Sequence, residues 1–142
     1  MAAKGRERRS AAAHLLQWMQ GMDVSKNQSV DWSQLDTEVI KFAMIKATDG
    51  INYVDPKFNS NWMAAGQLNT IKRGAYHFFR PDDAVDDQIR LIRETVILNP
   101  NDFQMVINVE NTRNRKLTAA GPVDLDRFNG SFEGLLRLAS LS

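Results

Sequence analysis

The stretch FQMVINVE at residues 103–110 decides which class of fold this sequence favours. It follows an Asn-Pro-Asn-Asp turn signal at residues 99–102, and its short apolar run with branched residues predicts a buried strand. Because side chains alternate along a strand, Asn108 and Glu110 fall on one side and the apolar residues between them on the other. A polar pair at the C-terminal end of a buried strand is where α/β enzymes place their chemistry, although a glutamate that merely caps the next loop explains this stretch equally well.

Three earlier segments show the same combination of an apolar run and a polar end. They predict strands at residues 18–25, 41–47 and 71–79, which makes 103–110 the fourth strand. Helices are expected at residues 30–35, from residue 55, at residues 84–98 and from residue 122. Successive strand–helix units imply a parallel sheet with right-handed crossovers, and therefore an α/β fold.

Two of these helices have clear signals at their starts. Asp31 is the expected N-cap of the short first helix, and Asp55 followed by Pro56 is expected to begin the second. Within the second helix, Trp62 lies four residues after Phe58 and therefore on the same helical face. This spacing assigns Trp62 to the core rather than to a platform on which a sugar would stack.

The composition describes one ordinary globular domain with no sign of a metal or cofactor. The chain has 142 residues, of which 43% are hydrophobic, and its net charge of +1 gives no indication of a nucleic-acid partner. It has no cysteine and two histidines, so no metal or other cofactor is predicted. The aspartates at 82, 83, 86 and 87 are interpreted as complements of a helix dipole rather than a cation site. No apolar run approaches the roughly 20 residues that cross a bilayer, so no membrane partner is expected.

Residues 1–20 are expected to be a basic N-terminal extension, with the folded domain at residues 21–142. Four basic residues precede the apolar run at residues 11–16, and these are Lys4, Arg6, Arg8 and Arg9. Polar residues interrupt what would be the core of a signal peptide, and no cleavage site of small residues follows. Basic residues without interleaved aromatic rings are typical of a solvated terminus.

Polar and aromatic side chains collect at the C-terminal ends of the four predicted strands. They are Asp23 and Ser25, Lys46 and Asp49, Tyr76, His77 and Phe79, and Asn108 and Glu110. If the strands are neighbours, these groups line one rim of the sheet. Aromatic rings stack on sugar faces, and carboxylates protonate a glycosidic oxygen or stabilise an oxocarbenium-like centre, so this rim favours a neutral polyhydroxylated substrate.

Together, the strand ends resemble the glycoside hydrolase family 25 lysozymes, the N-acetylmuramidases of bacteria and phages. The matching segments are residues 21–25 with Gln28, residues 31–32, 45–50, 53–58 and 74–78, and residues 109–110. The resemblance implies a (β/α) barrel of the TIM-like type, and hydrolysis of the β-1,4 bond between N-acetylmuramic acid and N-acetylglucosamine. With about four strand–helix units and no counterpart of the family's later strands after Ser142, we expect an incomplete, C-terminally truncated barrel domain.

The resemblance also implies roles for individual residues. Glu110 is similar in position to the family's general acid, and Asp23 to the carboxylate that helps shape the site. Tyr76 resembles the ring beside the catalytic pair, and Asp49 stands where the family usually has glutamate. Glu110, Asn108 and Asp23 are therefore the expected catalytic residues. The expected substrate-binding residues are Asp49, Tyr76, His77, Phe79, Lys46 and Ser25.

Asn108 departs from the family pattern, which has an Asp-x-Glu motif ending at the general acid. An amide cannot stabilise positive charge as a carboxylate does, but it can orient the substrate's own acetamido group by hydrogen bonding. Losing the charge removes several kcal/mol of transition-state stabilisation on the scale of single electrostatic groups. A muramidase with impaired activity is the leading hypothesis. A non-catalytic binder of cell-wall carbohydrate and a generic doubly wound α/β domain are the alternatives.

The expected partner is the glycan of peptidoglycan, so the protein is expected to act on the cell wall. An open sheet with an unpaired edge strand and exposed apolar residues would also favour self-association.

Overall fold

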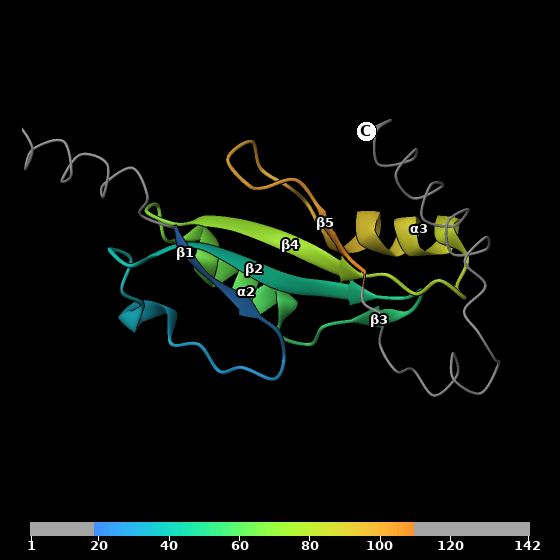
Figure 1. The fold of residues 1–142 in the computed structure, drawn as a ribbon, viewed down its shortest axis with the longest axis horizontal. Helices are drawn as coiled ribbons and strands as arrows, with labels where there is room; N and C mark the ends of the chain where they lie inside the picture. Colours follow the sequence, from blue (N-terminus) through green and yellow to red (C-terminus); the bar gives the residue numbers. More distant parts are fainter. Residues whose placement is uncertain (1–18, 110–142) are drawn as a thin grey trace, which may run out of the picture.

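A mainly parallel β-sheet forms the centre of the computed structural model, which describes residues 19–109 (Figure 1). Its strands are β1 (Gln20–Val24), β2 (Ile40–Asp49), β3 (Tyr53–Val54), β4 (Lys72–Phe78) and β5 (Val106–Asn108). The parallel strands lie in the order β1-β2-β4-β5, and the short β3 pairs antiparallel with the end of β2. The α/β class predicted from the sequence is confirmed, with β3 as an addition that no local pattern indicated.

Three helical segments connect the strands. They are the 3-10 helix η1 (Trp32–Gln34) and the α-helices α2 (Phe58–Gly66) and α3 (Val85–Thr95). Asp31 is the N-cap of η1 as predicted, because its carboxylate accepts a hydrogen bond from the Ser33 N–H at 3.1 Å. None of the helices between residues 19 and 109 is long and apolar enough to cross a membrane. The helix predicted from residue 122 and nearly all of the predicted extension lie outside the described residues.

The start of α2 differs from the prediction that Asp55 is its N-cap and Pro56 its first residue. The helix begins at Phe58, and Lys57 occupies the N-cap position. The Asp55 carboxylate instead accepts hydrogen bonds from the backbone N–H groups of Lys57 and Lys26, both at 2.9 Å. Through Lys57, the Asp55 carboxylate closes a turn ahead of the helix. Through Lys26, it ties this turn to the loop after β1, which is distant in the sequence.

Both described α-helices cover the same face of the sheet. The Arg73 guanidinium lies 3.9 Å from the centre of the Trp62 ring of α2, and His77 contacts Gln88 of α3. Arg73 and His77 are four residues apart on β4, so their side chains point the same way. A doubly wound domain carries helices on both faces, and the one-sided arrangement argues against that alternative.

The core lies between this covered face and α2. Its buried members are Val24, Ala43, Ile45, Ala47 and Ala75 from the sheet, and Phe58, Trp62 and Ala65 from α2. Trp62 is 9% exposed and stacks on Phe58, with the ring centroids 5.4 Å apart. The prediction that Trp62 packs in the core is therefore confirmed.

An irregularity in β2 decides which of its polar side chains reach the other, uncovered face. Lys46 and Thr48 pair with consecutive residues of β4, which leaves Ala47 as an extra residue. Thr48 consequently points to the covered face, where its hydroxyl oxygen lies 2.7 Å from Nδ1 of His77. Asp49 returns to the uncovered face, where its carboxylate meets Lys46.

Candidate active site

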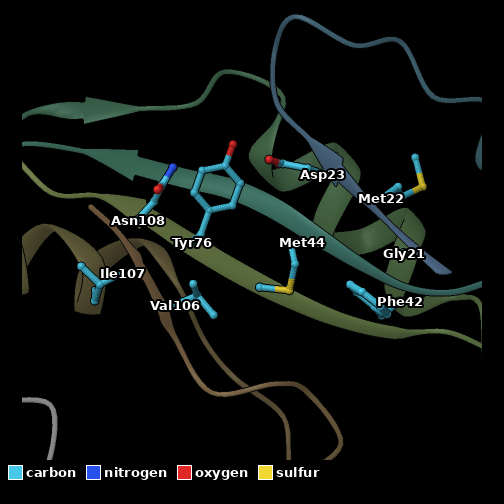
Figure 2. A pocket seen from close by; sticks show the side chains of 9 residues that line it. All are labelled: Gly21, Met22, Asp23, Phe42, Met44, Tyr76, Val106, Ile107 and Asn108. Carbon is cyan, nitrogen blue, oxygen red and sulfur yellow. The ribbon is translucent and has the colours of Figure 1, made fainter. Parts of the chain in front are cut away.

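An open hollow of about 520 Å³ lies over the uncovered face of the sheet (Figure 2). Four strands line it with Gly21, Met22, Asp23, Phe42, Met44, Tyr76, Val106, Ile107 and Asn108. A side chain at Gly21 would collide with the Phe42 ring, so this glycine leaves room for the apolar floor. Apolar side chains thus make up most of the lining, and a few polar groups stand among them, as in many sites for small ligands.

Three of the predicted site residues meet at this hollow. Asp23 extends from β1, Tyr76 from β4 and Asn108 from β5, and Figure 2 shows the Tyr76 ring between the other two side chains. Asp23 is exposed. Among residues 19–109, its carboxylate has no hydrogen-bond donor and forms no ion pair. A carboxylate, a phenol and an amide that face one hollow can bind the hydroxyl and acetamido groups of a sugar.

Asp49 also lies on the uncovered face, but its charge is compensated. Arg80 binds both carboxylate oxygens, with Nε 2.6 Å from Oδ1 and Nη2 3.0 Å from Oδ2, and Lys46 Nζ lies 3.2 Å from Oδ2. Burial raises the pKa of Asp49, but the hydrogen bonds and positive charges of Arg80 and Lys46 outweigh it and hold the pKa below its ordinary value. Asp49 therefore stays ionised at neutral pH and is unsuited to donate a proton.

Arg80 is a candidate residue that the sequence interpretation missed. Arg80 directly follows the predicted third strand, a position at which polar residues indicate a functional site. Its partner Asp49 is 31 residues away in the chain, so the sequence does not show the pair. The Arg80 guanidinium also lies 4.4 Å from the centre of the Phe78 ring. The pairing of β2 with β4, which local sequence does not reveal, brings these groups together.

The structure does not bring His77 and Phe79 to the rim with the other predicted residues. His77 follows Tyr76 directly, so alternation turns it to the helix-covered face, where it is completely buried. Both ring nitrogens have partners, Thr48 Oγ1 at 2.7 Å and Gln88 Oε1 at 2.9 Å. Burial lowers the pKa of His77 below its ordinary value. Phe79 is likewise only 1% exposed, so the substrate contacts predicted for these two residues find no support in their positions.

Gln88 of α3, another residue missed by the sequence interpretation, explains how His77 is held. Its Nε2 donates to the carbonyl oxygens of Arg80 at 2.9 Å and Asp83 at 3.2 Å, and its Oε1 accepts from the Arg80 N–H at 3.0 Å. This orientation makes Oε1 the acceptor for His77 as well, so Nε2 of His77 carries the proton. A signal was present in the sequence, because Gln88 lies three residues after Val85 and next to Ile89, on the side of the helix that carries these apolar residues.

Two predicted site residues remain, Ser25 and Glu110. Ser25 belongs to a turn after β1, where its N–H and its hydroxyl both donate to Gln28 Oε1, at 2.7 and 2.9 Å. Glu110, the predicted general acid, lies outside the described residues.

The four aspartates near the start of α3 fit the dipole interpretation only in part. Asp86 and Asp87 occupy the first helical turn, while the N-cap position is Ala84 and receives no side-chain hydrogen bond. Between residues 19 and 109, no group of three or more His, Asp or Glu side chains is arranged to hold a metal ion.

Comparisons with known proteins bear on this geometry. The uncharacterized protein YegX of Escherichia coli O157:H7 is 42% identical over 96 residues, which are 63% of this chain and 35% of YegX. Lysozyme M1 of Streptomyces globisporus is 48% identical over 65 residues, which are 45% of this chain and 22% of the lysozyme. A solved family 25 glycosyl hydrolase from Bacillus anthracis is similar with a TM-score of 0.74 and 30% identity, over 84% of this chain and 54% of that one. The chain thus spans about half the length of this structure and a smaller share of the other two.

The family itself is identified from a longer match. The sequence pattern of the glycosyl hydrolases family 25 matches residues 22–131, which include every predicted site residue. The match covers most of the sequence, and the resemblance seen at the strand ends is confirmed. The chain belongs to the glycosyl hydrolases family 25.

Proposed function

We propose that this protein hydrolyses the β-1,4 glycosidic bond between N-acetylmuramic acid and N-acetylglucosamine in bacterial peptidoglycan. The observation that carries the proposal is the meeting of Asp23, Tyr76 and Asn108 at one hollow, on strands of a family 25 chain. Support also comes from the printed names of relatives, which include Lysozyme M1 and an N,O-diacetylmuramidase from Chalaropsis.

The sheet is proposed to be one arc of a (β/α) barrel of the TIM-like type. The strand order β1-β2-β4-β5, with crossovers that put both described α-helices on one face, is the order in which such a barrel is built. The polar groups of the hollow, Asp23, Tyr76 and Asn108, would then lie toward the C-terminal ends of the strands, where barrel enzymes hold their active sites. The likeness to the Bacillus anthracis structure supports the same arrangement.

Glu110 is the proposed general acid. In the strand pattern it follows Asn108 by two residues, which is the spacing that keeps side chains on one face. Glu110 would donate its proton to the glycosidic oxygen as the bond to the sugar C1 breaks. The departing sugar leaves with a new hydroxyl. Water then adds to C1 as a hydroxyl and gives its other proton to the Glu110 carboxylate, which restores the acid.

Asn108 and Asp23 have complementary proposed roles. Asn108 would hydrogen-bond the substrate's acetamido group and hold it against C1, where its oxygen can form a transient bond. Asp23 lacks a counter-ion among residues 19–109, so its negative charge is available to stabilise the positive charge that develops on the sugar. Tyr76, between the two, would provide a ring on which the sugar packs.

A non-catalytic carbohydrate-binding protein is the second candidate function, and Asn108 is the observation that favours it. The hollow and its polar groups suffice for binding a glycan without cleaving it. Asn108→Asp distinguishes the two candidates, because a carboxylate restores the Asp-x-Glu pattern beside Glu110.

The test measures the release of reducing ends from purified peptidoglycan by the unmodified chain, by Asn108→Asp and by the control Asn101→Asp in the exposed turn before β5. For an enzyme with an impaired site, Asn108→Asp should increase the rate at least about tenfold while Asn101→Asp leaves it unchanged. Retained binding with no release by any of the three proteins would reject hydrolysis and establish the binding function.

A further inference from the structure

Cations and aromatic rings alternate along the rim next to the hollow. Lys26 Nζ lies 5.4 Å from the centre of the Tyr53 ring, and Lys46 Nζ lies 5.7 Å from the same ring. Lys46 Nζ is also 5.2 Å from the centre of the Phe78 ring, over which the Arg80 guanidinium lies at 4.4 Å. We call these five residues the cationic strip. Its rings hold the long side chains of the cations in place.

The cationic strip is continuous with the candidate active site. Phe78 is the register partner of Asn108 in β5, and Lys46 is the register partner of Tyr76 in β4. Phe78 follows Tyr76 by two residues, so the two rings share one face about 7 Å apart along the strand. A glycan bound at Tyr76 and Asn108 would therefore carry its substituents within reach of the strip.

Positive charge dominates this strip. Asp49 binds Lys46 and Arg80 together, so one carboxylate faces two cations. Asp83 adds a weaker negative influence on Arg80. Lys26 is exposed and has no ion pair among residues 19–109, and its backbone N–H is fixed by the buried carboxylate of Asp55 at 2.9 Å. The side chains of Lys46 and Arg80 are 19% and 30% exposed, which leaves part of each open to an incoming anion.

We propose that the cationic strip binds carboxylate groups on the short peptides attached to muramic acid, and so makes the protein select peptide-bearing glycan. The proposal rests on the proposed function, because it places these peptides beside a glycan held in the hollow. A neutral sugar chain offers lysine and arginine only uncharged oxygen acceptors, whereas a carboxylate accepts charge-assisted hydrogen bonds from them, which are roughly twice as strong. Lys26 is the sharpest probe, because no carboxylate among the described residues competes for its charge.

The test uses the full chain carrying Glu110→Gln, so that the polymer is bound and not digested. Co-sedimentation compares purified insoluble peptidoglycan with the same material after its carboxylates have been converted to methylamides. Capping should weaken binding about 3- to 10-fold, as expected for the loss of one charge-assisted contact. Adding Lys26→Gln should cause a similar loss on native polymer and no further loss on capped polymer.

Lys72→Gln is the matched control. Lys72 is also exposed and also stacks on a ring, with Nζ 4.4 Å from the centre of Phe103, but it lies at the opposite end of β4. The Lys72→Gln variant should bind native and capped polymer as tightly as the Glu110→Gln protein from which it is made. Equal binding of native and capped polymer by the parent, or an equal loss for Lys72→Gln and Lys26→Gln, would overturn the proposal.

Hydrolysis by the unmodified chain separates this proposal from the proposed function. Release of reducing ends without any preference for native polymer would reject the carboxylate site and keep the muramidase. A preference for native polymer without hydrolysis would reject the muramidase and keep the carboxylate site. Neither binding nor hydrolysis would overturn both.

Discussion

Asp23 and Asp49 show that the surroundings of a carboxylate decide what it can do in this site. Both lie on the uncovered face of the sheet, and both were expected at the rim from their places at strand ends. Arg80 and Lys46 compensate the charge of Asp49, whereas no described residue compensates that of Asp23. Asp49 therefore holds two cations in position, and Asp23 is the carboxylate that we propose stabilises a positively charged sugar.

Replacing Asp49 with Asn tests this assignment through stability. At pH 7 the substitution should lower the free energy of unfolding by about 1 to 3 kcal/mol, because Arg80 and Lys46 lose a charged acceptor. The folded-state pKa of Asp49 lies below its ordinary value of 3.8. The unmodified protein therefore keeps this stabilisation above pH 3.8 and loses it as the pH falls through the lower folded-state value.

Urea unfolding at neutral and acidic pH provides the measurement. The gap between the unmodified protein and Asp49→Asn should narrow as the pH falls below 3.8. Asp87→Asn is the control, because Asp87 forms an exposed pair with Arg90 and should change stability by no more than about 0.5 kcal/mol. A gap that is the same at both pH values would contradict the ion-pair assignment.

Single residues were predictable where one rule decides their position. Asp23, Tyr76 and Asn108 could be placed at one site because parallel strands bring their C-terminal ends to one edge. The position of His77 beside Tyr76 at a strand end does not bring it to the rim, because alternation along β4 turns its side chain to the opposite face. Arg80 was missed because its binding partner lies on another strand.

At the scale of secondary-structure elements, Gln88 links α3 to the sheet. Its amide is completely buried and bonds to His77, to both backbone groups of Arg80 and to the carbonyl of Asp83. The turn from β4 into α3 therefore depends on one side chain. The same turn also positions Arg80, which is the ion-pair partner of Asp49.

Gln88→Leu should destabilise the fold by about 2 to 4 kcal/mol, because several buried donors and acceptors lose their partner at once. Gln67→Leu is the control, since Gln67 is an exposed residue at the end of α2 and should change stability by no more than about 0.5 kcal/mol. Chemical unfolding of both variants supplies the comparison. Equal effects of the two substitutions would refute the role given to Gln88.

The elements themselves were largely visible in the sequence, because each has a periodic apolar pattern. The four parallel strands and α3 appear near their predicted positions, although β5 covers only Val106–Asn108 of the strand predicted at 103–110. The helix α2 begins two residues later than the capping signal at Asp55 and Pro56 suggested. The two-residue β3 and the extra residue Ala47 were not predicted. Both depend on pairing between strands, which local patterns do not encode.

At the scale of the whole molecule, the described residues form a sheet that is covered on one face and hollowed on the other. The chain spans 54% of the length of the similar Bacillus anthracis structure. Even so, the described residues assemble Asp23, Tyr76 and Asn108, and the family match extends over Glu110 to residue 131. The muramidase proposal specifies which sugar carries the new reducing end, namely N-acetylmuramic acid.

The most direct test is mass spectrometry of the new reducing ends released from purified peptidoglycan by the unmodified chain, by Glu110→Gln and by the control Glu94→Gln on the exposed side of α3. The predicted result is muramic acid at the new ends with the unmodified chain and Glu94→Gln, and none with Glu110→Gln. Ends that carry N-acetylglucosamine, or release that persists in Glu110→Gln, would contradict a muramidase with Glu110 as its acid.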